Sequence, residues 1–346
     1  MKLRILLTIL VCFLLHTSLT AELIDEYQAE RVAKNFYYHH SQMDYNAIIF
    51  NEVITVDEQG VPVYYIFNLP ADLGFVIVSA EDASYPILGF ANSGSFGLEN
   101  QPPNLRSWFQ VYRDQILFIR EQQLSATIHI KTSWQEYDEG FKLNRGGNRN
   151  IVGPYIDDIL WNQGCYYNDS CPADASGPCG HVYAGCVATA ASMIMKYHHH
   201  PHQGSGSYSY VHPIYGTQSA NYAATTYDWG NMPEFDANAN VAQLLYHMGV
   251  AVDMDYGPSG SGASSALVVN ALETYFNYDP VATWNYKASY TDPVWEGMVM
   301  AELNAERPLY YRGQGGQGGH AFVCDGYDDD YSGSGNVYFH FNWGWS

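Results

Sequence analysis

Residues that can support nucleophilic acyl transfer occur in the order Gln, Cys, His, Asn along this chain of 346 residues. Cys186 follows Gly185 and opens the run CVATAASMIMKYHHHP, which predicts a helix that ends before Pro201. At the first turn of a helix, unpaired backbone N–H groups and the helix dipole favour a thiolate. A buried structural cysteine is an equally good interpretation of this segment alone. The choice depends on whether a base lies within reach of the thiol.

His320 is the best candidate for that base among the 13 histidines. It follows the stretch GQGGQGG and begins HAFVCDGY, which predicts a strand. The glycines leave the imidazole accessible to a ligand, and a strand holds it rigidly. From this segment alone, the alternative that His320 is an ordinary exposed histidine at the junction of a loop and a strand remains open.

Two further segments carry side chains that would complete such a site. LWNQG places Gln163 before the cysteine, where its amide N–H can donate to a developing oxyanion. FHFNWGW follows the histidine, so Asn342 can orient the imidazole and Trp343 can shield that hydrogen bond from water. Each residue is ordinary by itself, as a turn or core residue. Their order along the chain is the informative feature.

Two competing motifs point to a metal or a nucleotide, and neither fits. His198 and His202 have the spacing of a zinc-binding pair, but Pro201 lies between them and interrupts the helix that would align them. The histidines are better explained as a polar helix end that complements the dipole. GQGGQG matches G-x-G-x-x-G, but a strand follows it instead of a helix. We therefore predict neither a metal site nor a cofactor.

Bulk composition limits the class of protein. The chain is long enough for two domains, and 47% hydrophobic with 15% aromatic residues predicts a globular protein. The formal net charge of −21 argues against a nucleic-acid partner, because binding a phosphate backbone needs clustered lysine and arginine.

The N-terminus has the layout of a secretory signal peptide. Lys2 and Arg4 precede an apolar run, and small residues follow up to Ala21. A run of about 11 apolar residues is too short to span a bilayer, and no later segment is long enough. We therefore expect residues 1–21 to be removed, giving a secreted, extracellular protein with no membrane span. A soluble N-terminal helix is the alternative.

Cysteine usage agrees with export. Removal of the signal peptide would leave five cysteines, an odd number, so at least one thiol stays free. In an oxidising compartment we expect a local disulfide among Cys165, Cys171 and Cys179, although the sequence does not say which pair forms it.

The pattern along the chain mixes helices with strands. It predicts helices over residues 25–38, 105–123 and 240–250, and strands Val61–Leu69 and Gly74–Ala80. Apolar periodicity fades between residues 125 and 150. The segment KLNRGGNRN (residues 142–150) predicts an exposed, protease-sensitive linker and a domain boundary.

Several of these segments resemble one known family. GCVATAASMIMKY, GGHAFVCDGY and FNWGWS resemble the catalytic blocks of the streptopain-type cysteine peptidases, a papain-like family. Residues 63–90 resemble the inhibitory propeptide of that family, and residues 249–263 resemble its substrate-cleft block. His320 lies 134 positions after Cys186 (320 minus 186), close to the separation of about 130–150 in papain-like enzymes.

The resemblance implies an α+β fold, with a signal peptide (1–21), an α+β inhibitory propeptide (22–145) and a papain-like two-lobed peptidase domain (146–346). It implies that Cys186 is the nucleophile, that His320 is the general base and acid, and that Gln163 and the Cys186 N–H form the oxyanion hole. Asn342 and Trp343 would support His320. The expected protein is a zymogen that cleaves protein or peptide substrates after its own propeptide is removed.

The chain departs from the family in two respects. It stops at Ser346, just after the WGW block, where family domains continue with further strands, so we expect a C-terminal truncation. The three cysteines between residues 165 and 179 are not a general family feature. The alternative from another functional class is a non-catalytic secreted binding or adhesion protein that retains the peptidase fold.

Overall fold

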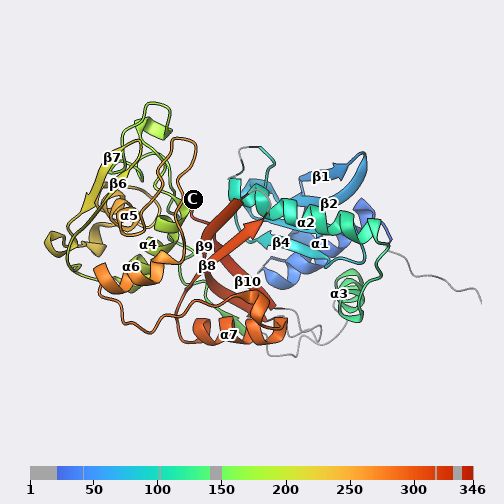
Figure 1. The fold of residues 1–346 in the computed structure, drawn as a ribbon. Coiled ribbons are helices and arrows are strands. Elements are labelled where there is room, and N and C mark those ends of the chain that lie inside the picture. Colours follow the sequence, from blue (N-terminus) through green and yellow to red (C-terminus); the bar gives the residue numbers. More distant parts are fainter. Residues whose placement is uncertain are drawn as a thin grey trace, which may run out of the picture. The chain divides into compact units, whose positions relative to one another are not determined.

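The chain forms two compact units. The structure is a computed structural model that describes residues 22–345, apart from Gln42, Asn100, Pro102 and residues 141–149, 316–317 and 330–336. One unit takes in the described residues up to Leu98 and from Gln110 onward, as far as the predicted linker. The other takes in Glu99–Phe109 and the described residues that follow the linker (Figure 1). The predicted signal peptide lies outside the described residues, as does the predicted linker except Asn150.

The first unit packs a helix on an antiparallel sheet. Helix α1 (Glu26–His40) begins at Asp25, whose carboxylate accepts a hydrogen bond from the backbone N–H of Gln28. Its buried Phe36 meets Phe90 edge to face. The sheet has the order β1-β2-β3-β4, with strands β1 (Glu52–Glu58), β2 (Val61–Asn68), β3 (Phe75–Ser79) and β4 (Ile87–Ala91). The predicted helix and the two predicted strands are confirmed.

Two helices complete the N-terminal half of the chain. Helix α2 (Pro103–Glu121) confirms the helix predicted over residues 105–123. Helix α3 (Ile128–Glu139) lies in the part of the sequence where apolar periodicity fades, and it was not predicted. Its apolar stripe is too short to stand out in the sequence. Thr127 caps the helix at its start. Its buried aromatic residues are Trp134 and Tyr137, three residues apart. The Trp134 indole N–H donates to the Ser84 carbonyl at 2.9 Å.

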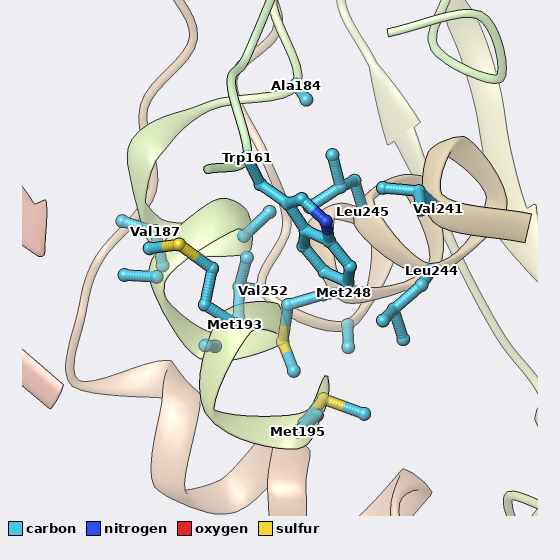
Figure 2. Close-up of a cluster of buried hydrophobic side chains, with 14 of the residues drawn as sticks. Trp161, Ala184, Val187, Met193, Met195, Val241, Leu244, Leu245, Met248 and Val252 are labelled. Carbon is cyan, nitrogen blue, oxygen red and sulfur yellow. The ribbon is translucent and has the colours of Figure 1, made fainter. Parts of the chain in front are cut away.

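The second unit contains a helical core. Figure 2 shows Trp161 enclosed by side chains of two of its helices, α4 and α5, and Trp161 is fully buried. The helices are α4 (Cys186–His198), α5 (Ala239–Ala251), α6 (Leu267–Tyr275) and α7 (Asp292–Asn304), and a hairpin is formed by β6 (Tyr208–His212) and β7 (Gly216–Ala220). Short 3-10 helices cover Tyr45–Ala47, Pro70–Asp72, Pro178–Gly180, Tyr222–Ala224, Trp229–Asn231 and Lys287–Ser289.

An antiparallel sheet forms the rest of the second unit. Strand β9 (Gly318–Asp329) pairs with β8 (Leu309–Gly315), β10 (Val337–Asn342) and the short β5 (Asn150–Val152). All paired strands that the structure describes are antiparallel, and helices accompany both larger sheets, which confirms the α+β class. No helix in the described part of the chain is long and apolar enough to cross a membrane.

A local disulfide is present where the sequence predicts one. It joins Cys165 to Cys179, and Cys171 between them is a buried free thiol. Cys324 is also free and buried, and Cys186 is free and half-buried.

Candidate active site

Cys186 is the first residue of α4. The chain turns into the helix at Gly185, which has φ 93°, and a Cβ there would lie 2.7 Å from the Met254 side chain and 3.2 Å from the Ser261 carbonyl. A larger residue would be both strained and crowded, so glycine is required before the cysteine. The predicted position of Cys186 at the helix start is therefore confirmed.

The electrostatic setting of the thiol differs from the one expected of a helix N-terminus. Burial raises the pKa of Cys186, although the backbone N–H groups of Ala321 and Val187 favour the thiolate. Loss of water around the sulfur outweighs those donors, so this geometry favours the neutral thiol. A reactive thiolate at neutral pH needs a proton acceptor close to the sulfur.

His320 lies on β9, where it pairs with Gly313 of β8. Its Nε2 is 3.0 Å from the Trp343 carbonyl oxygen. Because a carbonyl only accepts, we assign the ring proton to Nε2, which leaves Nδ1 unprotonated and able to act as a base. Burial lowers the pKa of His320 to about 4, against the opposing hydrogen bond to Trp343. The imidazole is therefore neutral at physiological pH.

The two residues are not engaged with each other in this uncleaved chain. Among the described residues, no hydrogen bond joins Cys186 to His320, although Ala321, directly after the histidine, has its N–H near the Cys186 sulfur. Burial shifts both pKa values toward the uncharged forms of the thiol and the imidazole. The components of a dyad are in one region, but the proton-transfer contact is not formed.

Asn342 does not take the position predicted for it. Its amide group donates to the carbonyls of Ile156 (3.2 Å) and Ile159 (2.9 Å), and its oxygen accepts from the Gly344 N–H. On β10 it pairs with Val323 and not with His320. The backbone carbonyl of Trp343 holds the imidazole instead, so in this structure Asn342 supports the loop beside the site.

Aromatic rings line the site beside His320. The Trp343 ring lies near-parallel to the imidazole, at 19° with 6.3 Å between centroids, and 4.6 Å from the ring of Phe322. Within the same unit, the Trp108 ring meets Trp343 edge to face at 5.4 Å. Apolar rings exclude water from His320, which is 8% exposed, and this is consistent with its lowered pKa.

Gln163 is connected to both halves of the site. Its side-chain Nε2 donates to the Gly344 carbonyl at 3.3 Å, and its backbone carbonyl accepts from the Ala184 N–H at 2.9 Å, two residues before Cys186. Gly344, with φ 69°, packs on Thr189 of α4, where an added Cβ would approach to 3.1 Å. The structure thus brings Gln163 and His320 together at Gly344 and Trp343, beside the helix that begins at Cys186.

Two features of this region were not found from the sequence. Gly344 connects Gln163 with the helix of Cys186. The WGW block identifies this segment in the sequence but does not indicate that role. The half-buried Tyr310 hydroxyl donates to Ser265 Oγ at 2.8 Å, and burial raises its pKa against that hydrogen bond. No motif distinguishes Tyr310 among 30 tyrosines.

The histidine run after α4 has a structural setting. The helix ends at His198, His199 follows in the left-handed region (φ 48°), and His200 Nε2 is 3.1 Å from the Asn277 carbonyl. The described residues include no group of three or more His, Cys, Asp or Glu side chains that could hold a metal. The predicted helix end before Pro201 is confirmed.

Comparisons with known proteins agree with this geometry. Residues 161–346 match the model of the Peptidase C10 family, and residues 21–116 match the model described as Spi protease inhibitor. The chain belongs to the peptidase C10 family. The resemblance to streptopain-type peptidases is thereby confirmed.

Relatives of this C10 chain cover both matched parts. Streptopain of Streptococcus pyogenes is 32% identical over 300 residues, which are 81% of this chain and 71% of streptopain. Thiol protease/hemagglutinin PrtT of Porphyromonas gingivalis is 30% identical over 362 residues, but the chain spans only 40% of the length of that protein. The solved structure of a prointerpain A fragment from Prevotella intermedia matches with a TM-score of 0.66 and 29% identity, covering 85% of this chain and 88% of that one.

Proposed function

We infer that this chain is a secreted cysteine endopeptidase made as a zymogen, with Cys186 as nucleophile and His320 as general base and acid. One observation carries the inference: a buried histidine and a buried glutamine amide contact the Trp343–Gly344 backbone, and Gly344 packs on the helix that begins at Cys186. Membership of the peptidase C10 family supports it.

The chemistry follows from the protonation states. Nδ1 of His320 accepts the thiol proton once the two groups meet, and the thiolate attacks a peptide carbonyl. The Gln163 amide and the backbone N–H of Cys186 donate to the oxyanion. His320 then protonates the leaving amine, and water releases the acyl group from the sulfur. No cofactor takes part in this scheme.

The zymogen part of the proposal rests on the N-terminal half. Residues 1–21 would direct export, residues 22–145 would inhibit, and residues 146–346 would form the peptidase domain. The inhibitor-type match and the packing of Trp108 on Trp343, beside the imidazole, support this organisation. Cleavage in the predicted linker would release the peptidase.

The proposal is tested by Cys186→Ala and His320→Ala in the full chain. Both substitutions should abolish peptide hydrolysis and self-cleavage between residues 140 and 152, because either change removes a group that takes part in bond breaking. Mass spectrometry of the purified proteins measures the cleavage. Normal processing by purified Cys186→Ala protein contradicts the proposal.

The second candidate is a non-catalytic secreted binding or adhesion protein with the same fold. The name of PrtT, which includes "hemagglutinin", is the observation that favours it, and the chain covers only part of that protein. A peptidyl electrophile that modifies thiols separates the candidates. Selective modification of Cys186 after linker cleavage supports the peptidase, and absence of modification supports the binding protein.

A further inference from the structure

The backbone between Gln163 and Ala184 leaves the active-site region and returns to it. We call residues 164–183 the pre-nucleophile loop. It begins directly after the candidate oxyanion-hole residue Gln163, and Ala184 after it lies two residues before Cys186. The Gln163 carbonyl accepts from the Ala184 N–H, so the two ends of the loop are hydrogen-bonded neighbours.

The body of the loop is fixed by polar contacts away from its ends. The fully buried Asn168 amide donates to three carbonyls, at 2.9 Å to Pro178, 3.2 Å to His181 and 3.1 Å to Val182. The Val182 N–H donates to the Pro172 carbonyl at 3.0 Å. These contacts maintain the shape of the loop and do not involve Gln163.

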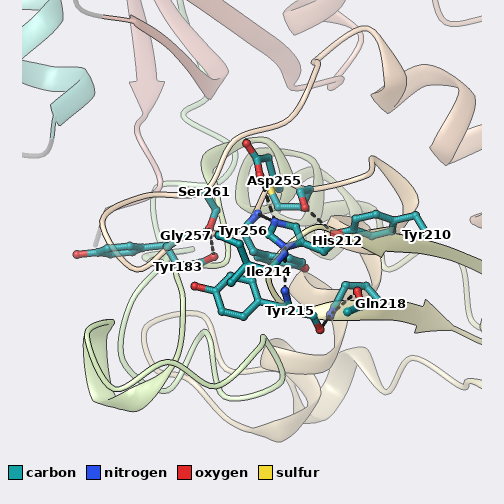
Figure 3. A network of polar contacts seen from close by, with 12 residues as sticks. Tyr183, Tyr210, His212, Ile214, Tyr215, Gln218, Asp255, Tyr256, Gly257 and Ser261 are labelled. Atoms are coloured by element: carbon teal, nitrogen blue, oxygen red, sulfur yellow. Dashed lines mark hydrogen bonds and ion pairs between the residues drawn. The ribbon is translucent and has the colours of Figure 1, made fainter.

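The outgoing limb of the loop is anchored to the neighbouring segment. Ser261 Oγ donates to the Tyr183 carbonyl at 2.6 Å, and the Tyr183 N–H donates to the Gly257 carbonyl at 3.3 Å (Figure 3). The backbone N–H of Tyr256 is in turn 3.1 Å from Nε2 of the buried His212 on β6. The limb that leads into Cys186 is therefore tied to a hydrogen-bonded network.

The Cys165–Cys179 disulfide connects the incoming limb to this anchored part. Cys165 is two residues after Gln163, and Cys179 is four residues before Tyr183. Cys179 has φ 54°, a left-handed conformation that is unfavourable for a non-glycine residue and persists only where its surroundings impose it. The cross-link therefore joins the residue two positions after Gln163 to the limb that leads into Cys186.

We propose that the Cys165–Cys179 disulfide is a positioning element of the oxyanion hole, which keeps the Gln163 amide in place beside Cys186. The disulfide touches no reacting atom and acts through Gln163. This inference rests on the proposed peptidase function. Nothing in the chemistry of the nucleophile requires the disulfide, so its loss should affect oxyanion stabilisation and spare the reactivity of the thiol.

The test compares four linker-cleaved proteins: wild type, Gln163→Ala, the double variant Cys165→Ser with Cys179→Ser, and the three changes combined. All are cleaved in trans by immobilised wild-type enzyme, which is then removed. Two rates are measured: kcat on a peptide amide, and alkylation of Cys186 by iodoacetamide, a displacement that forms no carbonyl oxyanion. Peptide mapping confirms that Cys186 is the site of alkylation.

The double variant should lose about tenfold in kcat through a small displacement of Gln163, with KM and the alkylation rate close to wild type. In the Gln163→Ala background, loss of the disulfide should cause little further decrease, because groups that act through one another are not additive. Unchanged kcat, an equal decrease in both backgrounds, or a matching decrease in alkylation overturns the inference. If wild type neither cleaves peptides nor is alkylated, the proposed function itself fails.

A second measurement tests the inference even if the double variant misfolds. Cys179 is exposed, so a phosphine reductant can open the disulfide in folded wild-type enzyme. The free thiols of Cys171 and Cys324 are buried. The kcat should fall in proportion to the fraction reduced, as determined by mass spectrometry. Constant kcat on full reduction overturns the inference.

Discussion

Cys186 and His320 lie on parts of the second unit that are stabilised by different means. The cysteine follows an irregular loop that is held by a disulfide, a buried amide and single backbone hydrogen bonds. The histidine lies in the register of an antiparallel sheet and among stacked aromatic rings. Regular strands satisfy their own backbone groups, whereas an irregular segment needs side chains to do so.

The difference shows where the site is sensitive to substitution. On the base side, the position of His320 follows from strand pairing, to which many residues contribute. On the nucleophile side, the position of Cys186 depends on a few named contacts. Gly344 belongs to both sides, because its carbonyl accepts from Gln163 while the preceding carbonyl, that of Trp343, faces His320.

Gly344→Ala should therefore produce the largest effect among the variants that retain all proposed catalytic groups. The added methyl would approach Thr189 to 3.1 Å at φ 69°, which displaces the backbone that holds both Gln163 and His320. A displacement of this kind can lower kcat by about 10²-fold. Steady-state kinetics of the linker-cleaved enzyme measure the change.

Gly216→Ala is the matched control. Gly216 has the same φ of 69°, but an added Cβ there meets no atom within 4 Å. It carries the backbone strain without the displacement, so kcat should stay within twofold of wild type. A similar loss of kcat in both variants would mean that strain, and not the junction at Gly344, explains the effect.

The same contrast explains what the sequence could predict. Periodicity and glycine placement predict the strand that carries His320 and the helix that begins at Cys186. The order of the motifs predicts that Gln163 belongs with them. The sequence does not decide whether the Asn342 side chain or the adjacent Trp343 carbonyl holds the imidazole, because that choice depends on register. The disulfide pair was undetermined because all three cysteines lie close together in the sequence. Helix α3 was missed because its buried face has only two aromatic side chains, too few to give a clear periodic pattern.

Asn168→Ala should separate the stability of the pre-nucleophile loop from catalysis. The substitution leaves the carbonyls of Pro178, His181 and Val182 without their shared donor in a buried site, at a cost of about 1–3 kcal/mol in the free energy of unfolding. Because the disulfide still restrains the ends of the loop, kcat should change less than twofold. Urea unfolding and steady-state kinetics measure the two quantities.

Asn240→Ala serves as the reference for that comparison. The Asn240 amide donates to an exposed carbonyl, that of Asn231, at 3.4 Å, so its loss should change stability by less than about 0.5 kcal/mol. If Asn168→Ala is no more destabilising than Asn240→Ala, the buried amide does not hold the loop. If Asn168→Ala lowers kcat tenfold, the body of the loop positions Gln163 as well.

The smallest effect is expected on the base side, at a second histidine of the sheet. His340 on β10 is 2.6 Å from the fully buried Asp325 carboxylate, whose other oxygen accepts from the Ile156 N–H. Burial opposes the charge on His340, but the hydrogen bond and charge of Asp325, together with the charge of Asp157, raise its pKa. The folded state therefore binds this proton more tightly than the unfolded state does.

The stabilisation from this proton is fully present below about pH 6.5, the pKa of an unfolded histidine, and is lost as pH rises through the higher folded pKa of His340. Wild type should thus exceed His340→Gln in the free energy of unfolding by more at pH 5.5 than at pH 8.5. Titration of His320 and the other histidines is common to both proteins and cancels in the difference. A difference that does not change with pH would show that His340 acts only as a neutral hydrogen-bond donor, and that the base side is held by strand register and aromatic packing without a contribution from charge.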